Sequence, residues 1–227
     1  MENSGKIKLS ERRKRQLLIG LTAVLVILIL LFHRPAAYHP VYVRSDNSIS
    51  TYLTNELLPA IYNGAQREQP FEAVITQESI NEVVGRLDST SSPYKGGGSR
   101  LSKPMVVFSP GRVVLMGTIN QGGLKFVISF ETEPRINEPN SVNLRLTSVK
   151  IGALSVTPFA RRLARRMYRE QIAAERDMQD IGGLIIRMVL NDEPVESVFD
   201  IEDKEIRVEK IIVSEGKLAI RLVPVKK

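Results

Sequence analysis

The side chains that most often do chemistry in enzymes are scarce in this sequence. Histidine occurs only as His33 and His39, and cysteine does not occur at all. Catalytic triads of the Ser-His-Asp or Cys-His type need an imidazole beside the nucleophile, and zinc prefers imidazole and thiolate ligands. Both histidines lie within a few residues of a long apolar segment, away from the rest of the chain. The sequence therefore predicts no catalytic residue, no metal site and no cofactor, and we expect a protein that is not an enzyme.

Two other clusters have only part of the pattern of a ligand site. The acidic cluster holds seven residues in fourteen positions: Asp192, Glu193, Glu196, Asp200, Glu202, Asp203 and Glu205. It contains no glycine and is interrupted by Pro194, unlike a calcium loop, which favours a solvated acidic connection. The Gly96-Gly97-Gly98 run lacks the Gly-Lys-Ser/Thr ending of a phosphate-binding loop, which favours a plain flexible loop over 88–103.

The positive charge of the chain belongs mostly to its N-terminus. Of the formal net charge of +7, residues 1–40 contribute +5, from seven basic and two acidic residues. The remaining 187 residues contribute only +2, from 25 basic and 23 acidic residues. A basic patch that binds nucleic acid should lie on the folded domain, so we expect no nucleic-acid partner.

A membrane anchor is predicted near the N-terminus. The sixteen residues Leu17–Phe32 carry no charge and as a helix would span about 24 Å, close to the roughly 30 Å hydrocarbon core. The basic cluster 12–15 precedes them, and the positive-inside rule then places residues 1–16 in the cytoplasm. We expect an uncleaved anchor at 17–34 in the cytoplasmic membrane, a linker at 35–49 and an extracytoplasmic, periplasmic domain at 50–227. A cleaved signal peptide is the alternative, but Pro35-Ala36-Ala37 puts proline at the first small position.

Periodicity and turn residues predict the elements that follow. Ser50 or Thr51 caps a short helix that ends at Asn63-Gly64, residues 71–75 alternate as a strand, and Thr76 caps a helix to Leu87. A meander comprises strands at 105–109, 112–119 and 124–131, followed by a loop at 134–139 and a strand at 142–151. The phase of this last strand slips near Ser148, which indicates a β-bulge. A hairpin of 205–213 and 217–225 closes the chain.

The segment 112–119 is apolar on both faces, which predicts that other elements cover both sides of this strand.

After the last strand of the meander, the turn 151–158 leads into an amphipathic helix at 158–177, with Thr157 as its cap and Pro158 in its first turn. A further helix is plausible at 178–190. Opposite the apolar stripe of helix 158–177 lies an arginine face: Arg161, Arg162, Arg165, Arg166 and Arg169. It fits a solvated surface, an anionic lipid surface or the acidic patch of a partner.

These elements predict an α+β fold in which a curved antiparallel sheet packs around the long helix 158–177. The apolar residues of the sheet and of this helix would line an apolar groove or an ordinary core: Val113, Leu115, Phe126, Ile128 and Phe130 from the strands, and Leu163 and Met167 from the helix.

The order of these motifs resembles a known family. A short anchor, the capped helix at Ile75–Asn81, strands around Pro110-Gly111, the segment Val149–Pro158 and a closing hairpin resemble the YpmS-like family of bacterial membrane-anchored proteins. The pattern is also similar to the tubular lipid-binding (TULIP, SMP-like) domains, and that resemblance implies a curved sheet around a helix and a lipid groove. The arginine-rich helix and the loop 88–103 depart from the pattern, and no functional residue is carried over.

The sequence leaves two hypotheses for function. The first is non-enzymatic binding of a lipid or similar apolar ligand at the membrane face. The alternative is a tethered scaffold that docks envelope proteins. The lipid-binding hypothesis requires an open interior in the domain, whereas the scaffold hypothesis requires a closed core. Neither hypothesis determines the oligomeric state.

Overall fold

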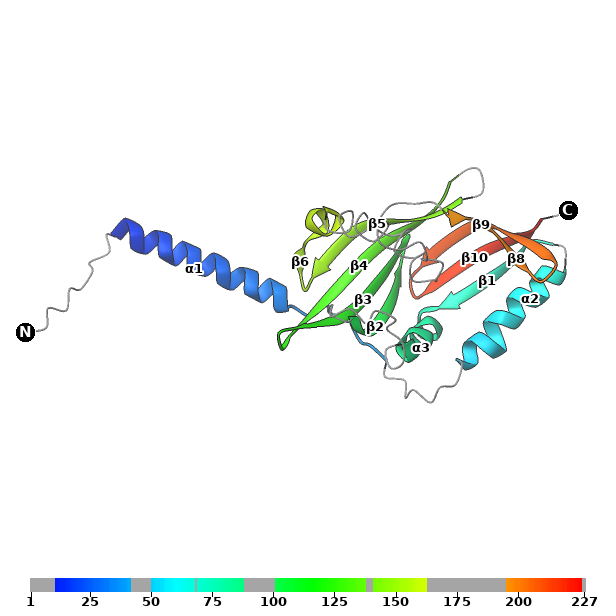
Figure 1. Ribbon diagram of the computed structural model, residues 1–227, viewed down its shortest axis with the longest axis horizontal. Helices are drawn as coiled ribbons and strands as arrows, with labels where there is room; N and C mark the ends of the chain where they lie inside the picture. The colour runs from blue at the N-terminus through cyan, green and yellow to red at the C-terminus, as the bar shows by residue number, and fades with distance from the viewer. Residues whose placement is uncertain are drawn as a thin grey trace, which may run out of the picture.

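A computed structural model describes residues 11–41, 50–67, 69–87, 101–137, 141–162 and 195–225. In these residues the chain forms an α+β body from which a single helix projects (Figure 1). That helix, α1 (Glu11–Phe32), is the one helix of the described residues that is long and apolar enough to cross a membrane. The predictions of an α+β class, antiparallel sheets and an apolar N-terminal helix are confirmed.

The strands divide between two antiparallel sheets, whereas the sequence predicted one. The four-stranded sheet has the order β1-β10-β9-β8 and comprises β1 (Phe71–Thr76), β8 (Val198–Ile201), β9 (Lys204–Ser214) and β10 (Lys217–Pro224). The six-stranded sheet has the order β2-β3-β4-β5-β6, with β7 also paired to β5. Its members are β2 (Leu101–Ser109), β3 (Arg112–Gln121), β4 (Leu124–Asn137), β5 (Ser141–Ile151), β6 (Leu154–Ser155) and β7 (Val195–Glu196).

The two sheets meet at the tips of their hairpins. The Gly111 amide donates to the Val213 carbonyl at 2.9 Å, and the Gly216 amide donates to the Phe108 carbonyl at 3.1 Å. Buried Val106, Phe108 and Val213 form the core beneath this junction. A strand pattern shows which residues alternate but not which sheet the strand joins, and for this reason the division was not predictable from the sequence.

Helix α3 (Gln77–Leu87) covers the outer edge of β2. Its predicted cap is confirmed, because the Ser79 amide donates to Thr76 Oγ1 at 3.2 Å. The side chain of buried Asn81 pairs with both backbone groups of Val106: its Nδ2 donates to the carbonyl and its Oδ1 accepts from the amide, each at 2.7 Å. Gln77 Oε1 accepts from the Phe108 amide at 2.9 Å. Two side chains thereby take the place of a neighbouring strand along an edge that would otherwise be open.

The helix before β1 runs past its predicted end. It comprises a first turn at residues 51–52, a π-helical stretch η1 (Leu53–Leu57) and α2 (Leu58–Gln66), so the predicted stop at Asn63-Gly64 is wrong. Gly64 lies inside the helix, where a Cβ would fall 2.3 Å from the ring of Phe71. The glycine therefore permits close packing of α2 against β1, beside the fully buried Ala65 and Ile206.

Tyr52 ties the start of this helix to β1. Its hydroxyl donates to the Val74 carbonyl at 3.2 Å. Burial, and secondly the nearby carboxylate of Glu56, raise the pKa of Tyr52 above its usual 10.0. Because the raised pKa favours the protonated folded form, its contribution to stability is present at neutral pH and is lost only as the pH rises through the phenol's folded pKa.

The meander agrees with its prediction except at two loops. The predicted loop 88–103 is wrong at its end, because β2 already begins at Leu101. The turns at Pro110-Gly111 and Gly122-Gly123 and the closing β9–β10 hairpin are confirmed. The predicted loop at 134–139 is partly wrong, since β4 continues through Pro134, paired with Leu144, to Asn137. The predicted bulge in β5 is confirmed: the register shifts opposite Glu131 and Thr132, and the hydroxyl of the extra residue, Thr147, donates to the Glu131 carbonyl at 2.9 Å.

Candidate functional site

One face of the six-stranded sheet is apolar over three adjacent strands. On β4 it carries Phe126, Ile128 and Phe130, all half-buried. Directly paired residues of an antiparallel sheet share a face, and the partners on β3 are Ile119, Gly117 and Leu115, while those of Ile128 and Phe130 on β5 are Ile151 and Val149. Val113 follows Leu115 on the same face. The five groove candidates from β3 and β4 are therefore brought together, and we refer to this surface as the apolar face.

The opposite face of the sheet is covered by the segment that follows α1. Tyr38, 2% exposed, packs with Met105 and Met116 and against Val114 and Val127. Its hydroxyl lies 2.8 Å from the Lys103 carbonyl, to which it donates, and 2.9 Å from Thr118 Oγ1. The prediction that 112–119 is covered on both sides is thus confirmed for Val113–Met116, with Tyr38 on one side and the hairpin-tip core on the other.

Removing the Tyr38 hydroxyl should weaken this contact measurably. For Tyr38→Phe we expect the free energy of unfolding to fall by about 1–2 kcal/mol, because the Lys103 carbonyl loses a donor in a buried place. Urea denaturation of the full chain in mild detergent measures the change. Tyr62→Phe is the control, since Tyr62 is 42% exposed on α2; equal midpoints for the two variants would contradict the structural role of Tyr38.

The last turn of α1 is held against the body from two sides. The rings of Phe32 and Phe126 lie 5.1 Å apart, centroid to centroid, at the end of the apolar face. From the β5–β6 turn, the Ala153 amide donates to the Leu30 carbonyl at 2.8 Å, and the Gly152 amide donates to the Val127 carbonyl at 2.7 Å. Gly152 has φ +59°, and a Cβ there would lie 2.3 Å from the Leu30 oxygen. The glycine is therefore needed both for the turn and for the approach of the helix.

The turn 151–158 leads into a helix that starts one residue before its predicted position. The Val156 carbonyl accepts the first helical bond, from the Ala160 amide at 2.8 Å. Thr157 is therefore already helical rather than the cap, and its hydroxyl instead accepts from the Val149 amide at 2.9 Å. Within this first turn Arg161 and Arg162 are exposed, but Arg161 Nη2 donates to the Leu146 carbonyl. The guanidinium of Arg161 is thus turned back onto the sheet.

Several predicted residues and elements fall outside the described residues. These are Leu163 and Met167 of the apolar candidates, Arg165, Arg166 and Arg169 of the arginine face, the predicted helix 178–190, residues 42–49 and the glycine-rich run at 96–98. The packing of the long helix against the sheet therefore remains a prediction.

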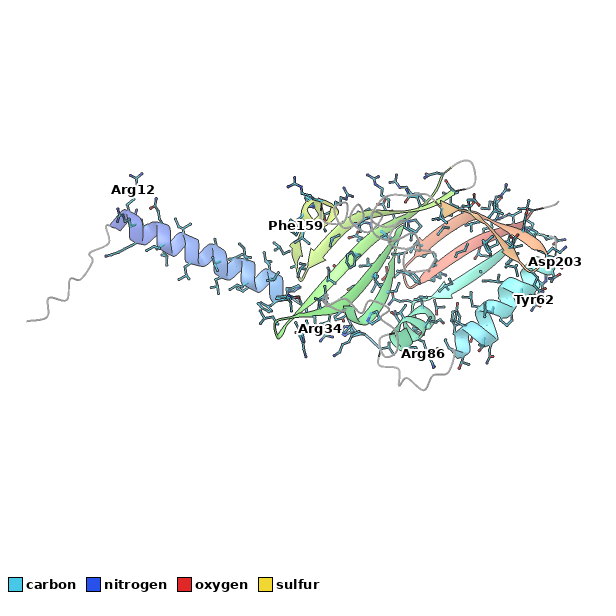
Figure 2. All side chains as sticks on the ribbon, in the orientation of Figure 1. Arg12, Arg34, Tyr62, Arg86, Phe159 and Asp203 are labelled. Carbon is cyan, nitrogen blue, oxygen red and sulfur yellow. The ribbon has the colours of Figure 1, made fainter. Side chains whose placement is uncertain are left out.

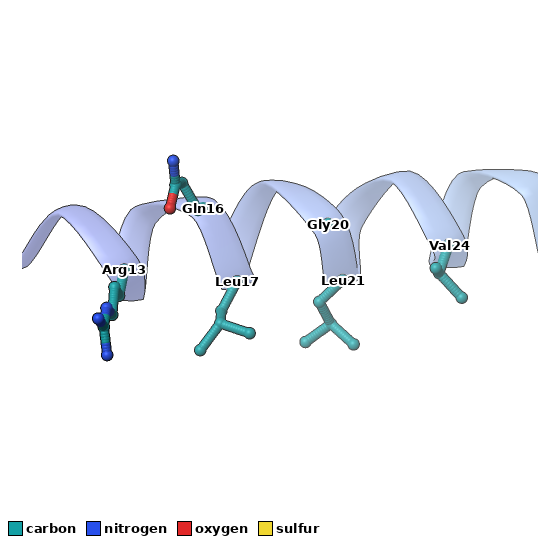
Figure 3. A pocket seen from close by; sticks show the side chains of 6 residues that line it. All are labelled: Arg13, Gln16, Leu17, Gly20, Leu21 and Val24. Carbon is teal, nitrogen blue, oxygen red and sulfur yellow. The ribbon is translucent and has the colours of Figure 1, made fainter. Parts of the chain in front are cut away.

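A shallow hollow lies along α1. It is lined by Arg13, Gln16, Leu17, Gly20, Leu21 and Val24 (Figure 3). All six residues come from one helix, and Gly20 leaves a notch between its larger neighbours. A depression in the surface of one helix does not enclose a ligand, so it is not a binding pocket of the usual concave kind.

The described residues contain no group of three or more histidine, cysteine, aspartate or glutamate side chains that could hold a metal ion. The part of the acidic cluster that the structure describes lies on β7, β8 and the start of β9, where Asp200 pairs with Glu205 across the strands. These carboxylates are distributed along an exposed hairpin.

Sequence reasoning missed Phe32, Tyr38 and the contact role of Gly152. An aromatic residue just after an apolar helix is typical of a membrane interface. Tyr38 fits that pattern, so its burial in the sheet was not predictable from the sequence. Glycine in a turn is expected for its positive φ alone, so nothing in the local sequence indicates the helix that packs against it. Comparison of the chain with models of protein families, with curated proteins and with solved structures finds no match.

Proposed function

We propose that the protein is a single-pass membrane protein whose extracytoplasmic domain binds a lipid or similar apolar ligand at the outer face of the cytoplasmic membrane, without catalysing a reaction. The apolar, exposed α1 supports the anchor. The cluster Arg12–Arg15 at its start supports a cytoplasmic N-terminus.

The observation that carries the proposal is the continuity between α1 and the apolar face. Phe126 contacts Phe32 at the point where α1 ends. From there Ile128 and Phe130 continue along β4 as half-buried side chains. An acyl chain that leaves the bilayer beside α1 would meet this row of side chains first. In the proposal the sheet curves around helix 158–177, and the space between them holds the apolar ligand, as the resemblance to TULIP-like domains implies.

A polar substitution on the apolar face tests the proposal. In Ile128→Asn, an amide replaces a side chain that would touch the ligand, and an unpaired polar group costs about 1–3 kcal/mol, or about five-fold to 150-fold in affinity. We expect the full chain, purified in mild detergent, to lose its tightly bound lipid by native mass spectrometry and lipid extraction.

The control is Val74→Asn, because Val74 is 45% exposed on β1 of the other sheet. Lipid that surrounds α1 is the same in both variants, so a difference between them reports the domain alone. Equal lipid content in the two variants and the unsubstituted chain would exclude a groove. A closed interior would then favour the tethered scaffold, for which reversal of Arg161, Arg165 and Arg169 to Glu should abolish binding of envelope partners.

A further inference from the structure

We propose that the end of the body from which α1 projects is seated in the headgroup layer of the bilayer, and that Leu124 and Phe159 are inserted into this layer on either side of the anchor. The partner is the anionic phospholipid surface of the leaflet from which α1 emerges. This inference rests on the membrane anchor of the proposed function and is independent of any lipid groove. We refer to the segments 30–41, 120–127 and 150–162 together as the rim.

The position of the rim follows from the contacts of α1. The helix ends at Phe32 against β4, and its Leu30 carbonyl is bonded to the β5–β6 turn. Figure 1 shows α1 leaving the body at this end, with the β3–β4 turn on one side and the start of the helix after β6 on the other. A bilayer that encloses α1 must therefore meet both segments.

Within the described residues, the rim exposes four large apolar side chains: Phe32, Val41, Leu124 and Phe159. Phe159 is 69% exposed and Leu124 is 52% exposed. Leu124 begins β4, two residues before Phe126, and Phe159 lies at the same end of the molecule as Arg34 (Figure 2). Exposed apolar side chains that gather around the exit of a membrane helix are typical of groups that bury themselves at the membrane interface.

The length of α1 leaves room for these side chains in the bilayer. The uncharged run Leu17–Phe32 spans about 24 Å against a hydrocarbon core of about 30 Å. If the basic cluster before it lies in the inner headgroups, about 6 Å of the outer leaflet remains beyond Phe32. Arg34 does not oppose insertion, because its guanidinium is directed back to the body, where it donates to the Tyr38 carbonyl at 2.9 Å.

The charge of the rim fits an anionic surface. Its three segments contain no aspartate or glutamate and five basic residues: Arg34 and Arg161, whose guanidinium groups are bonded to backbone carbonyls, and the exposed Lys125, Lys150 and Arg162. Segment 196–205, by contrast, contains five acidic residues and one lysine. Asp203 of this segment lies at the opposite end of the molecule from Arg34 and Phe159 (Figure 2). The two ends are thus oppositely charged, with the basic end beside the anchor.

The experiment uses single tryptophan reporters, because the chain has no tryptophan of its own. Full-length variants L124W, F159W, F199W and L25W are reconstituted into vesicles of phosphatidylcholine with about one third phosphatidylglycerol, a composition with an anionic surface. Bromine on the acyl chains quenches nearby tryptophan. Phe199, 38% exposed on β8, is the distant control, and Leu25, 57% exposed in the middle of α1, reports the span.

We expect strong quenching for L124W, F159W and L25W and little for F199W. If L25W is quenched but L124W and F159W behave as F199W does, the rim is not seated and this inference is wrong, while the anchor and the lipid groove stand. If L25W is not quenched either, the anchor itself fails, and this inference fails with it.

Charge reversal tests the anionic partner. Lys125→Glu with Arg162→Glu in the F159W chain should reduce quenching, because both side chains are exposed on the rim. Lys210→Glu with Lys217→Glu makes the same change of charge at exposed positions of the four-stranded sheet and should have no effect. Equal quenching in the two double variants would overturn the assignment of an anionic surface.

Discussion

Gly152→Ala should separate α1 from the body. A Cβ at this position would lie 2.3 Å from the Leu30 oxygen and 2.5 Å from the Leu31 oxygen, both of them backbone atoms of α1. Backbone cannot rotate aside as a side chain can, so the β5–β6 turn and the helix end must move apart and lose the bond from the Ala153 amide to Leu30. We expect the free energy that holds α1 against the body to fall by about 2–4 kcal/mol, from the clash, the strained φ and the lost hydrogen bond together.

Spin labels measure this separation directly, because the chain has no cysteine to compete for them. Labels at Ile29→Cys in α1 and Lys125→Cys on β4 should give a narrow distance distribution, and Gly152→Ala should broaden it. Gly122→Ala is a matched control: its φ of +58° imposes the same backbone strain, but a Cβ there meets nothing within 4 Å. A distribution that broadens equally in both variants would show that strain alone, rather than the contact with α1, is responsible.

Asn81→Leu should be among the most destabilising single changes in the body. Leucine has the same branched arrangement of side-chain heavy atoms as asparagine but cannot pair with the amide and carbonyl of Val106, whose bonds to Asn81 are both 2.7 Å long. Each buried backbone group left without a partner costs about 1–3 kcal/mol, so we expect a total loss of about 2–6 kcal/mol for the two groups. Urea denaturation measures the loss, and hydrogen exchange should show the Val106 amide losing its protection.

The control for this change is Asn63→Leu, an exposed asparagine in the helix α2. We expect its stability to stay within about 0.5 kcal/mol of the unsubstituted chain. If Asn81→Leu unfolds at the same urea concentration as Asn63→Leu, the side chain of Asn81 does not stabilise the edge of β2.

Local sequence patterns were sufficient to predict those features that depend only on neighbouring residues in the chain. Thr76 caps α3 because a threonine oxygen satisfies a free amide at any helix start, and the bulge at Thr147 was visible because alternation in β5 changes phase there. Gly64 shows where this reasoning fails. Glycine after a helical pattern is typical of a helix end, yet α2 continues to Gln66, and at Gly64 the ring of Phe71 packs against the bare backbone.

Contacts between segments far apart in the chain were not predictable. Asn81 is 25 residues from Val106, and Tyr38 is 65 residues from Lys103. A side chain that replaces a missing strand or covers a distant sheet leaves no periodic trace in the sequence around it. The apolar candidates on β3 and β4 were grouped correctly because alternation places them on one face, whereas alternation says nothing about what lies over that face.

The buried position of Tyr38 also limits how far the body can travel from its anchor. A flexible linker over 35–49 would give a root-mean-square reach of about 20 Å. Tyr38 ends that freedom after a few residues, since its hydroxyl and ring are bonded and packed into the sheet. With the proposed anchor in a bilayer, the body would rotate and diffuse with α1 in the plane of that bilayer. It would then meet partners or lipids held in that plane by a two-dimensional search at constant height, whereas a partner several nanometres above the bilayer would have to approach by itself.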